Sequence, residues 1–131
     1  MSGQVKKRWQ EINALTLAYL GDAVYELWVR THLLSLGYEK VQELHQAAIS
    51  YVRASTQAQI LHRLMPELNE IERQVVLRGR NAKGSCPRNV DVTTYRHATA
   101  FECLVGYWQL EGRLERMNWA FAQIDQILGN H

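Results

Sequence analysis

The segment spanning residues 17–26 is a run of mostly apolar residues with helical spacing and with Gly21 and Asp22 at its centre. An ionised carboxylate is costly to bury in an apolar helix unless something pairs with it. Glycine inside a helix costs about 1 kcal/mol relative to alanine, so we expect a partner helix or a ligand to approach the backbone closely at Gly21. A chain with this segment has to fold around a core helix that also carries a polar site.

The apolar spacing along the rest of the chain predicts an all-α fold. The first long helix is expected to begin after Asn13, a favourable N-cap, and to end near Gly37. Asp22 falls roughly opposite the face that this helix is expected to bury. Apolar or aromatic residues occur all round the helix, so we expect it to be covered on most sides. The expected core face comprises Leu17, Leu20, Val24, Leu27, Trp28 and Thr31.

Later helices are predicted from the same spacing and from helix breakers. Residues 40–64 are expected to form one or two amphipathic helices, and the next helix is expected to have Pro66 in its first turn and to end near Gly79. Residues 80–92 contain several breakers and predict a loop, after which Thr93 or Thr94 is expected to cap another helix. The core candidates are Val41, Leu44, Ala48, Tyr51, Val52, Ile60 and Leu61, followed by Ala98, Phe101, Leu104, Val105 and Trp108.

The composition is typical of a globular protein, since 47% of the 131 residues are apolar and 21% are charged. This length allows one domain around one core, so residues 1–131 are expected to form a single domain. No apolar run approaches the length of a membrane span and no signal-peptide pattern opens the chain. Two cysteines do not make a disulfide framework, which favours a reduced cytoplasmic setting. Cys86 and Cys103 lack metal-ligand spacing and the histidines form no zinc motif, which disfavours a disulfide framework and a zinc enzyme.

Positive charge is concentrated in one segment. Residues 73–96 carry six basic side chains and one acidic side chain, Asp91, for a net charge of +5. Because the whole chain carries +2, the remainder carries −3. A positive segment on an otherwise acidic domain is typical of a site for a polyanion such as RNA or DNA.

Asp22 and a second acidic residue, Glu102, are the candidate ligands of a metal ion. Glu102 lies in another apolar helical stretch, with small residues one turn before and one turn after it. Carboxylates on rigid helices are ligands that Mg²⁺ and Mn²⁺ prefer, and an acidic site of this kind indicates phosphodiester chemistry. The alternatives are that Asp22 pairs with an arginine or hydrogen-bonds within the core, and that Glu102 is simply solvated. Glu26 lies one turn after Asp22 on the same side; it is expected to have a structural role through contacts with Arg30, and the alternative is that it joins the site.

The sequence Arg-Gly-Arg-Asn-Ala-Lys at residues 78–83 is expected to contact phosphates. Arginine and lysine supply positive charge, while glycine and asparagine permit a tight backbone. The alternative is a solvated loop whose basic residues satisfy a helix C-terminus. The density of charge favours the nucleic-acid site, for which the candidate RNA-binding residues are Arg78, Arg80, Lys83, Arg88 and Arg96.

These motifs resemble those of a known family. Leu-Gly-Asp-Ala-Val at residues 20–24 resembles the signature helix of the ribonuclease III catalytic domain, and Ala-Phe-Glu-Cys-Leu-Val-Gly at residues 100–106 resembles its second acidic motif. The form of residues 17–26, the basic run at residues 78–83 and Tyr-Arg-His-Ala-Thr at residues 95–99 are most similar to the short bacterial branch, the Mini-ribonuclease III enzymes. The resemblance covers nearly the whole chain.

The resemblance implies an all-α homodimer with the ribonuclease III catalytic-domain fold. It implies an endoribonuclease that cleaves double-stranded RNA with Mg²⁺, or with Mn²⁺ as a substitute, and leaves 5′-phosphate and 3′-hydroxyl ends. Asp22 and Glu102 match the motif carboxylates and inherit both the metal-binding and the catalytic roles. The family acts in maturation of the precursor of the large-subunit (23S) ribosomal RNA. That precursor is therefore the expected partner, and the resemblance leaves open a ribosomal protein as a helper.

The sequence departs from the ordinary family pattern at two acidic positions. Ordinary ribonuclease III has a Glu one turn before the motif Asp and an Asp three residues before the motif Glu, where Ala18 and Thr99 stand here. Fewer carboxylates count against a permanently bound cluster of two metal ions. They also leave open a rival class, a non-catalytic RNA-binding or ribosome-assembly module on the same fold. A third class, a helical protein-interaction domain, would leave the basic segment unexplained.

Ordinary ribonuclease III also carries a separate domain that binds double-stranded RNA. The present chain is too short for such a domain, so the substrate contacts are expected to come from the catalytic domain itself.

Overall fold

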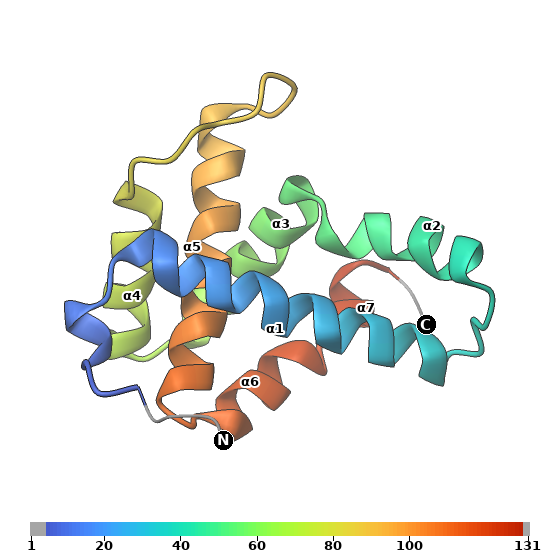
Figure 1. The fold of residues 1–131 in the computed structure, drawn as a ribbon, viewed down its shortest axis with the longest axis horizontal. Coiled ribbons are helices and arrows are strands. Elements are labelled where there is room, and N and C mark those ends of the chain that lie inside the picture. The colour runs from blue at the N-terminus through green and yellow to red at the C-terminus, as the bar shows by residue number, and fades with distance from the viewer. Residues whose placement is uncertain (1–4, 130–131) are drawn as a thin grey trace.

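Helix α5 (Val92–Leu110) lies at the centre of the computed structural model, which describes residues 5–129. Helices α1 (Ala14–Ser35), α3 (Ala54–Leu64) and α4 (Glu70–Asn81) pack against it (Figure 1). Every residue of α5 from position 98 to position 108 is buried, except for the half-buried Glu102. The predicted core positions of this helix are therefore confirmed.

The other elements complete an entirely helical arrangement. Helix α2 (Val41–Val52) packs against α1, α6 (Leu114–Phe121) packs against α5, and α7 (Ile124–Ile127) packs against α3. Two short 3-10 helices, η1 (Trp9–Glu11) and η2 (Met65–Glu67), precede α1 and α4. All regular elements within residues 5–129 are helices, so the predicted all-α class is confirmed. None of the helices in this part of the chain has the length and apolar character needed to cross a lipid bilayer.

Helix α1 begins and ends where the sequence predicts. Asn13 is its N-cap, and the Oδ1 atom of Asn13 accepts a hydrogen bond from the backbone N–H of Leu15 at 2.8 Å. After the last turn, Gly37 has a φ of 101°, a left-handed conformation that glycine adopts without strain. Both boundary predictions for this helix are therefore confirmed.

Helix α5 has a different cap from the predicted one. Asp91 is the N-cap, since its Oδ1 atom accepts a hydrogen bond from the backbone N–H of Thr94 at 2.9 Å. The Thr94 hydroxyl group also donates to Asp91 Oδ2 at 2.6 Å. The prediction of Thr93 or Thr94 as the cap is wrong because the helix already begins at Val92, which places both threonines inside its first turn.

Helix α1 also buries a different face from the predicted one. Of the predicted face, Leu17 alone is fully buried, while Leu27 is 69% exposed and Thr31 is exposed. The periodicity failed because α1 is apolar on several sides, and the small residues Ala18 and Gly21 select the side that packs closely against α5. The buried residues are Ala14, Leu17, Ala18, Gly21, Tyr25, Val29 and Leu33.

Residues 40–64 form two helices that meet at Arg53, whose extended backbone separates them. Among the predicted core residues, Tyr51, Ile60 and Leu61 are buried, whereas Val41 is 79% exposed. Val41 lies in the first turn of α2, at the end of that helix farthest from α3 along the chain. The prediction that Val41 belongs to the core of the single chain is therefore wrong.

The start of α4 differs from the predicted one, and its end lies two residues past Gly79, near the predicted end. Pro66 lies in η2, and α4 begins after the N-cap Asn69. Gly79 does not end α4, which continues to Asn81. A Cβ atom at Gly79 would lie 2.7 Å from the Cα atom of Ala100, so this glycine permits close packing of α4 on α5. The loop between these helices is correspondingly shorter than predicted and covers residues 82–91.

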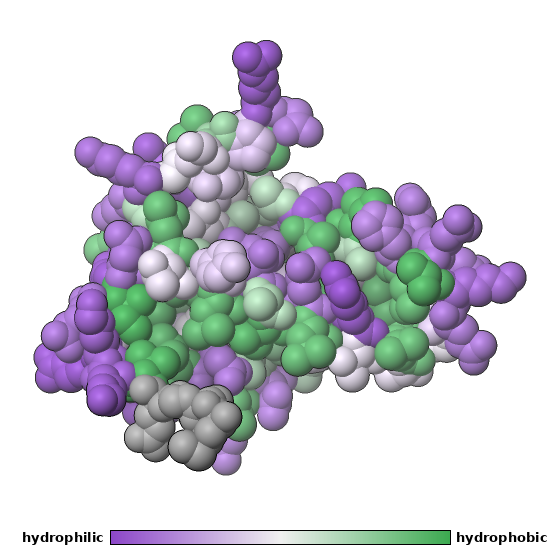
Figure 2. Space-filling model, in the orientation of Figure 1, coloured by the Kyte–Doolittle hydropathy of each residue, from purple (hydrophilic) through white to green (hydrophobic). Residues whose placement is uncertain are grey.

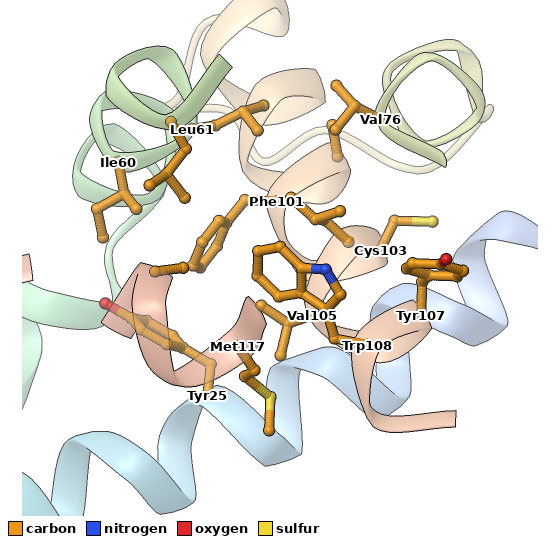
Figure 3. Close-up of a cluster of buried hydrophobic side chains, with 14 of the residues drawn as sticks. Tyr25, Ile60, Leu61, Val76, Phe101, Cys103, Val105, Tyr107, Trp108 and Met117 are labelled. Carbon is orange, nitrogen blue, oxygen red and sulfur yellow. The ribbon is translucent and has the colours of Figure 1, made fainter. Parts of the chain in front are cut away.

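The core is built around the aromatic side chains of α5. Figure 3 shows Phe101 and Trp108 among side chains from the surrounding helices, including Tyr25 of α1 and Met117 of α6. The rings of Tyr25 and Phe101 meet edge to face, with their centroids 5.2 Å apart. Full burial of one large apolar side chain stabilises a fold by about 1.5–3 kcal/mol. This core fixes α1 and α3 on either side of the helix that carries Glu102.

Candidate metal centre and basic surface

Helices α1 and α5 cross with their backbones in direct contact. A Cβ atom at Gly21 would overlap the carbonyl oxygen of Glu102, and a Cβ atom at Gly106 would overlap that of Leu17. Glycine is required at both positions, which explains why a helix-weakening residue stands in the middle of each helix. The close approach expected at Gly21 is confirmed. Because Asp22 directly follows Gly21, the crossing places Asp22 close to Glu102.

The carboxyl groups of Asp22 and Glu102 interact beside this crossing. The pKa of Glu102 is raised to about 8, and burial is the largest cause, followed by the hydrogen bond and the negative charge of Asp22. A hydrogen bond with Gln57 lowers the pKa, and the negative charge of Glu26 raises it. Without a cation the protonated form of Glu102 is favoured, and a cation between the two carboxyl groups would replace that proton. Glu26 also makes its expected contact with Arg30, at 3.9 Å.

Glu72, which is also buried, shows what a structural glutamate looks like in this fold. Its carboxylate accepts hydrogen bonds from Arg116 Nε at 2.9 Å, Arg116 Nη2 at 2.8 Å and Trp108 Nε1 at 2.8 Å. Burial alone would raise the pKa of Glu72, but the bonds from Arg116, the Asn69 backbone and Trp108 hold it below its usual value. Glu102 has no ion-pair partner among the described residues. Its raised pKa is therefore typical of a functional carboxyl group.

Helix α3 contributes a polar residue that sequence reasoning missed. Gln57 is only 4% exposed, donates a hydrogen bond from Nε2 to the carbonyl oxygen of Val52 at 2.8 Å, and hydrogen-bonds the carboxyl group of Glu102. The signal was present in the sequence. Gln57 stands one turn before Ile60 and Leu61, at a position where the apolar stripe of α3 would continue.

The donor set fits a hard cation such as Mg²⁺ or Mn²⁺. Asp22 and Glu102 supply carboxylate oxygens, and Mg²⁺ is commonly held by one or two carboxylates while it keeps several waters. In residues 5–129, no group of three or more His, Cys, Asp or Glu side chains is arranged to hold a metal ion. Ala18 and Thr99, where the ordinary family pattern has carboxylates, are both buried. Only a cation that keeps much of its water therefore suits this pair.

Arg78 contacts the protein itself and does not extend toward solvent. Its Nη1 atom donates to the carbonyl oxygen of Trp9 at 3.2 Å, and Nη2 donates to that of Ile12 at 2.6 Å. The guanidinium carbon also lies 5.6 Å from the centroid of the Trp9 ring. These contacts hold the segment that leads into α1. The structure thus separates Arg78 from the other predicted RNA-binding residues.

The other four predicted RNA-binding residues are exposed around one end of the molecule. Figure 1 shows the loop between α4 and α5 projecting past the start of α5. Arg80 and Arg96 line the same hollow of about 220 Å³, together with Asn81, Thr93 and His97. The four residues, called the basic surface below, are Arg80, Lys83, Arg88 and Arg96.

Apolar side chains are exposed along one side of α1. Tyr19, Leu27 and Leu34 are 82%, 69% and 57% exposed, and their spacing of seven or eight residues places them on the same face. Leu34 also lines a hollow of about 510 Å³ between α1 and α2, together with Val41 and Ile49. Figure 2 shows apolar residues over this part of the molecule. These five residues are called the apolar face below, and such a patch is typical of an interaction surface.

Sequence comparisons place this arrangement among known proteins. The model of the Ribonuclease III domain matches residues 15–113, which include Asp22, Glu102 and the basic surface. A protein of Desulfitobacterium hafniense named Mini-ribonuclease 3 is 68% identical over 94% of this chain and 78% of its own length. The Mini-ribonuclease 3 of Symbiobacterium thermophilum is 55% identical over 79% of this chain and 81% of its own length. The Mini-ribonuclease 3 of Enterococcus faecalis is 42% identical over 90% of this chain and 95% of its own length.

The fold is also similar to that of a solved structure. A crystal structure of a protein from Fusobacterium nucleatum superposes with a TM-score of 0.84 at 28% sequence identity. The match covers 90% of this chain and 98% of that one, so the two proteins share nearly all of the helical arrangement described above.

Proposed function

Since this chain belongs to the ribonuclease III family, in the branch of the Mini-ribonuclease 3 proteins, we propose that Asp22 and Glu102 form its Mg²⁺-binding catalytic pair. The chain is an endoribonuclease, and its proposed substrate is double-stranded RNA. The observation that carries this assignment is the interaction of two carboxyl groups from different helices, in which Asp22 opposes the ionisation of Glu102. Family membership supports the reaction, and this pair supports the position of its centre.

Asp22 and Glu102 differ in exposure, and together they suit a metal centre for phosphodiester hydrolysis. A bound Mg²⁺ would lower the pKa of an attacking water and stabilise negative charge on the scissile phosphate. Glu102 is half-buried on α5 and would hold the cation as a carboxylate, whereas Asp22 is exposed on α1 and would leave the site open to a phosphate group. The attack breaks the bond from phosphorus to the 3′ oxygen, which gives the proposed 5′-phosphate and 3′-hydroxyl ends.

The basic surface is the proposed contact with the RNA backbone. Its four side chains are exposed, and Arg80 and Arg96 gather around one hollow. Double-stranded RNA is recognised mainly through its shape, its phosphates and its 2′-hydroxyl groups, for which such side chains are suited. By family resemblance, the proposed natural substrate is the 23S ribosomal RNA precursor in the cytoplasm, with a ribosomal protein as the proposed helper.

A second copy of the chain is the proposed occupant of the apolar face. Tyr19 and Leu27 lie on the same helix as Asp22, so a dimer formed through this face would have both metal centres near its interface. Two sites related by a two-fold axis can address the two strands of an A-form helix.

The alternative function is a non-catalytic RNA-binding or ribosome-assembly module on the same fold. The buried Ala18 and Thr99, which stand where the ordinary family pattern has two further carboxylates, favour this alternative. It retains the basic surface and requires no cation between Asp22 and Glu102.

Cleavage of a long double-stranded RNA in Mg²⁺ tests the proposal, with the wild type compared with Asp22→Asn, Glu102→Gln and the control Glu26→Gln. We expect cleavage by the wild type and by Glu26→Gln and none by the other two variants. Cleavage by Asp22→Asn at the wild-type rate would remove Asp22 from the site. If the wild type does not cleave the RNA but still binds it, the non-catalytic module is favoured, and a ribosomal RNA precursor is the next substrate to test.

A further inference from the structure

Gln57 contains an unpaired polar atom next to the proposed metal centre. Its side chain is 4% exposed, and Oε1 is the only buried side-chain nitrogen or oxygen atom in residues 5–129 without a hydrogen-bond partner. Buried polar atoms in folded proteins are nearly always paired, and an orphaned acceptor destabilises the fold. This oxygen atom therefore has no partner among residues 5–129, and a bound group with a hydrogen to donate would satisfy it.

The orientation of the Gln57 amide group is fixed from two directions. Nε2 donates to the carbonyl oxygen of Val52 at 2.8 Å, at the junction of α2 and α3. The amide group also hydrogen-bonds the carboxyl group of Glu102 on α5. Since Oε1 and Nε2 are bonded to the same carbon atom, these contacts hold Oε1 beside Glu102.

The helix junction alone does not explain why glutamine stands here. Thr56 already ties the same junction, since its hydroxyl group donates to the carbonyl oxygen of Ser50 at 2.6 Å. A leucine or methionine at position 57 would continue the apolar stripe toward Ile60 and Leu61 without burying an unpaired acceptor. The polar side chain is therefore better explained by its position next to Glu102.

The chemistry of the neighbours limits what can pair with Oε1. In the metal-free protein the proton of Glu102 lies in its hydrogen bond with Asp22 and is not directed to Oε1. When both carboxyl groups are ionised they are acceptors only, and Oε1 is an acceptor as well. A cation held by the two carboxylates would bring its own donors, because Mg²⁺ and Mn²⁺ usually keep several bound waters, and each water has hydrogens to donate.

We propose that Gln57 is a positioning residue of the metal centre, and that its Oε1 atom accepts a hydrogen bond from a water carried by the cation that Asp22 and Glu102 bind. This inference rests on the proposed function. It gives the centre an oxygen from a third helix, in a chain that has Ala18 and Thr99 where further carboxylates are expected. Such outer partners orient the groups that hold the metal and increase its affinity.

The test is a titration of the metal-free protein with Mn²⁺ in the absence of RNA, with free Mn²⁺ followed by electron paramagnetic resonance. Gln57→Leu removes both polar atoms at similar size, and we expect it to bind Mn²⁺ about tenfold or more weakly than the wild type. Gln57→Glu keeps an oxygen acceptor at the position and should bind at least as tightly as the wild type. Gln59→Leu is the matched control, because its amide donates to the carbonyl oxygen of Ile127 on the other side of α3, and its Mn²⁺ affinity should be unchanged.

A second measurement uses the wild type alone and does not depend on the folding of a variant. The side-chain amide resonances of Gln57 should shift when Mg²⁺ is added, whereas those of Gln59 should not. Two outcomes would overturn the role of Gln57 and leave the metal centre in place. In the first, Asp22→Asn loses Mn²⁺ binding but Gln57→Leu binds Mn²⁺ as tightly as the wild type. In the second, Mg²⁺ does not shift the Gln57 resonances. Absence of Mn²⁺ binding by the wild type itself would instead overturn the proposed centre together with this inference.

Discussion

Glu102 is in surroundings that favour its protonated form, and this makes the stability of the metal-free protein depend on pH. The pKa of its carboxyl group is 4.5 when unperturbed and about 8 in the fold. Below pH 4.5 the group is protonated in both states, and its contribution to the free energy of unfolding is fully present. As the pH rises from 4.5 through 8, the unfolded chain ionises first and that contribution is lost.

Glu102→Gln is expected to remove this pH dependence of stability, because its amide group cannot ionise. In a chelating buffer at pH 9 the variant should be more stable than the wild type by about 1–2 kcal/mol, a value reduced for the partial exposure of the side chain. At pH 4 this advantage should disappear, and Mg²⁺ at pH 9 should stabilise the wild type only. Urea denaturation at the two pH values measures the difference. The same difference at pH 4 and pH 9 would contradict the raised pKa.

Arg78 and Arg80 form a matched pair, two residues apart, with different expected effects. Arg78→Ala removes hydrogen bonds to Trp9 and Ile12 and should reduce the free energy of unfolding by about 1–3 kcal/mol. Arg80→Ala removes an exposed charge and should change stability by less than about 0.5 kcal/mol.

RNA binding should separate the same two variants in the opposite way. Arg80→Ala is expected to weaken binding and to flatten its dependence on salt, because one phosphate contact is lost. Lys83→Ala should behave in the same way. Thermal melts and a salt titration of RNA binding check both effects. An unchanged salt slope in Arg80→Ala and Lys83→Ala would remove the basic surface from the RNA site.

At the level of elements, the crossing of α1 and α5 is the contact on which the metal centre depends. Gly21→Ala would place a Cβ atom on the carbonyl oxygen of Glu102. Helices α1 and α5 cannot move apart to relieve this overlap without disrupting the core. We expect a loss of about 3 kcal/mol or more in the free energy of unfolding. Ala23→Gly, at an exposed position of the same helix, should lose only about 1 kcal/mol. Chemical denaturation of both variants tests this, and a Gly21→Ala variant as stable as the wild type would disprove the close crossing.

The helices were predictable where local chemistry determines them. Asn13 and Gly37 bound α1 as expected, because a cap and a left-handed glycine act over only a few residues. The buried face of α1 was not predictable, because several of its sides are apolar and the choice depends on how closely α5 approaches. The role of Gly79 was missed for the same reason, since its packing against Ala100 is a tertiary contact.

The candidate metal centre was predictable only in its acidic part. Asp22 and Glu102 stand out as charges in apolar helices, and both motifs are short and local. Gln57 carries no charge, and its relation to Glu102 arises only when α3 packs against α5. Arg78 and Arg80 look alike in sequence, and the difference between them depends on the Trp9 segment, which is distant along the chain.

At the level of the whole molecule, the apolar face predicts association of two chains. Leu27→Asp would place a charge in the middle of this face, and we expect it to convert a dimer into a monomer at micromolar concentration. Leu114→Asp is a suitable control, because Leu114 on α6 is 50% exposed and does not belong to the apolar face. Sedimentation of the wild type and both variants gives the masses. A monomeric wild type, or a dimer that tolerates Leu27→Asp, would disprove this interface.

The glycine crossing of α1 and α5 also determines how the molecule loses its function. Many enzymes carry their reactive groups on loops that open by local fluctuation long before the rest of the protein unfolds. Here Asp22 and Glu102 flank the contact between two core helices, so the backbone amides around them should exchange with solvent only through global opening. Heating should therefore abolish the site and the fold together, in one cooperative step and without a folded but inactive stage.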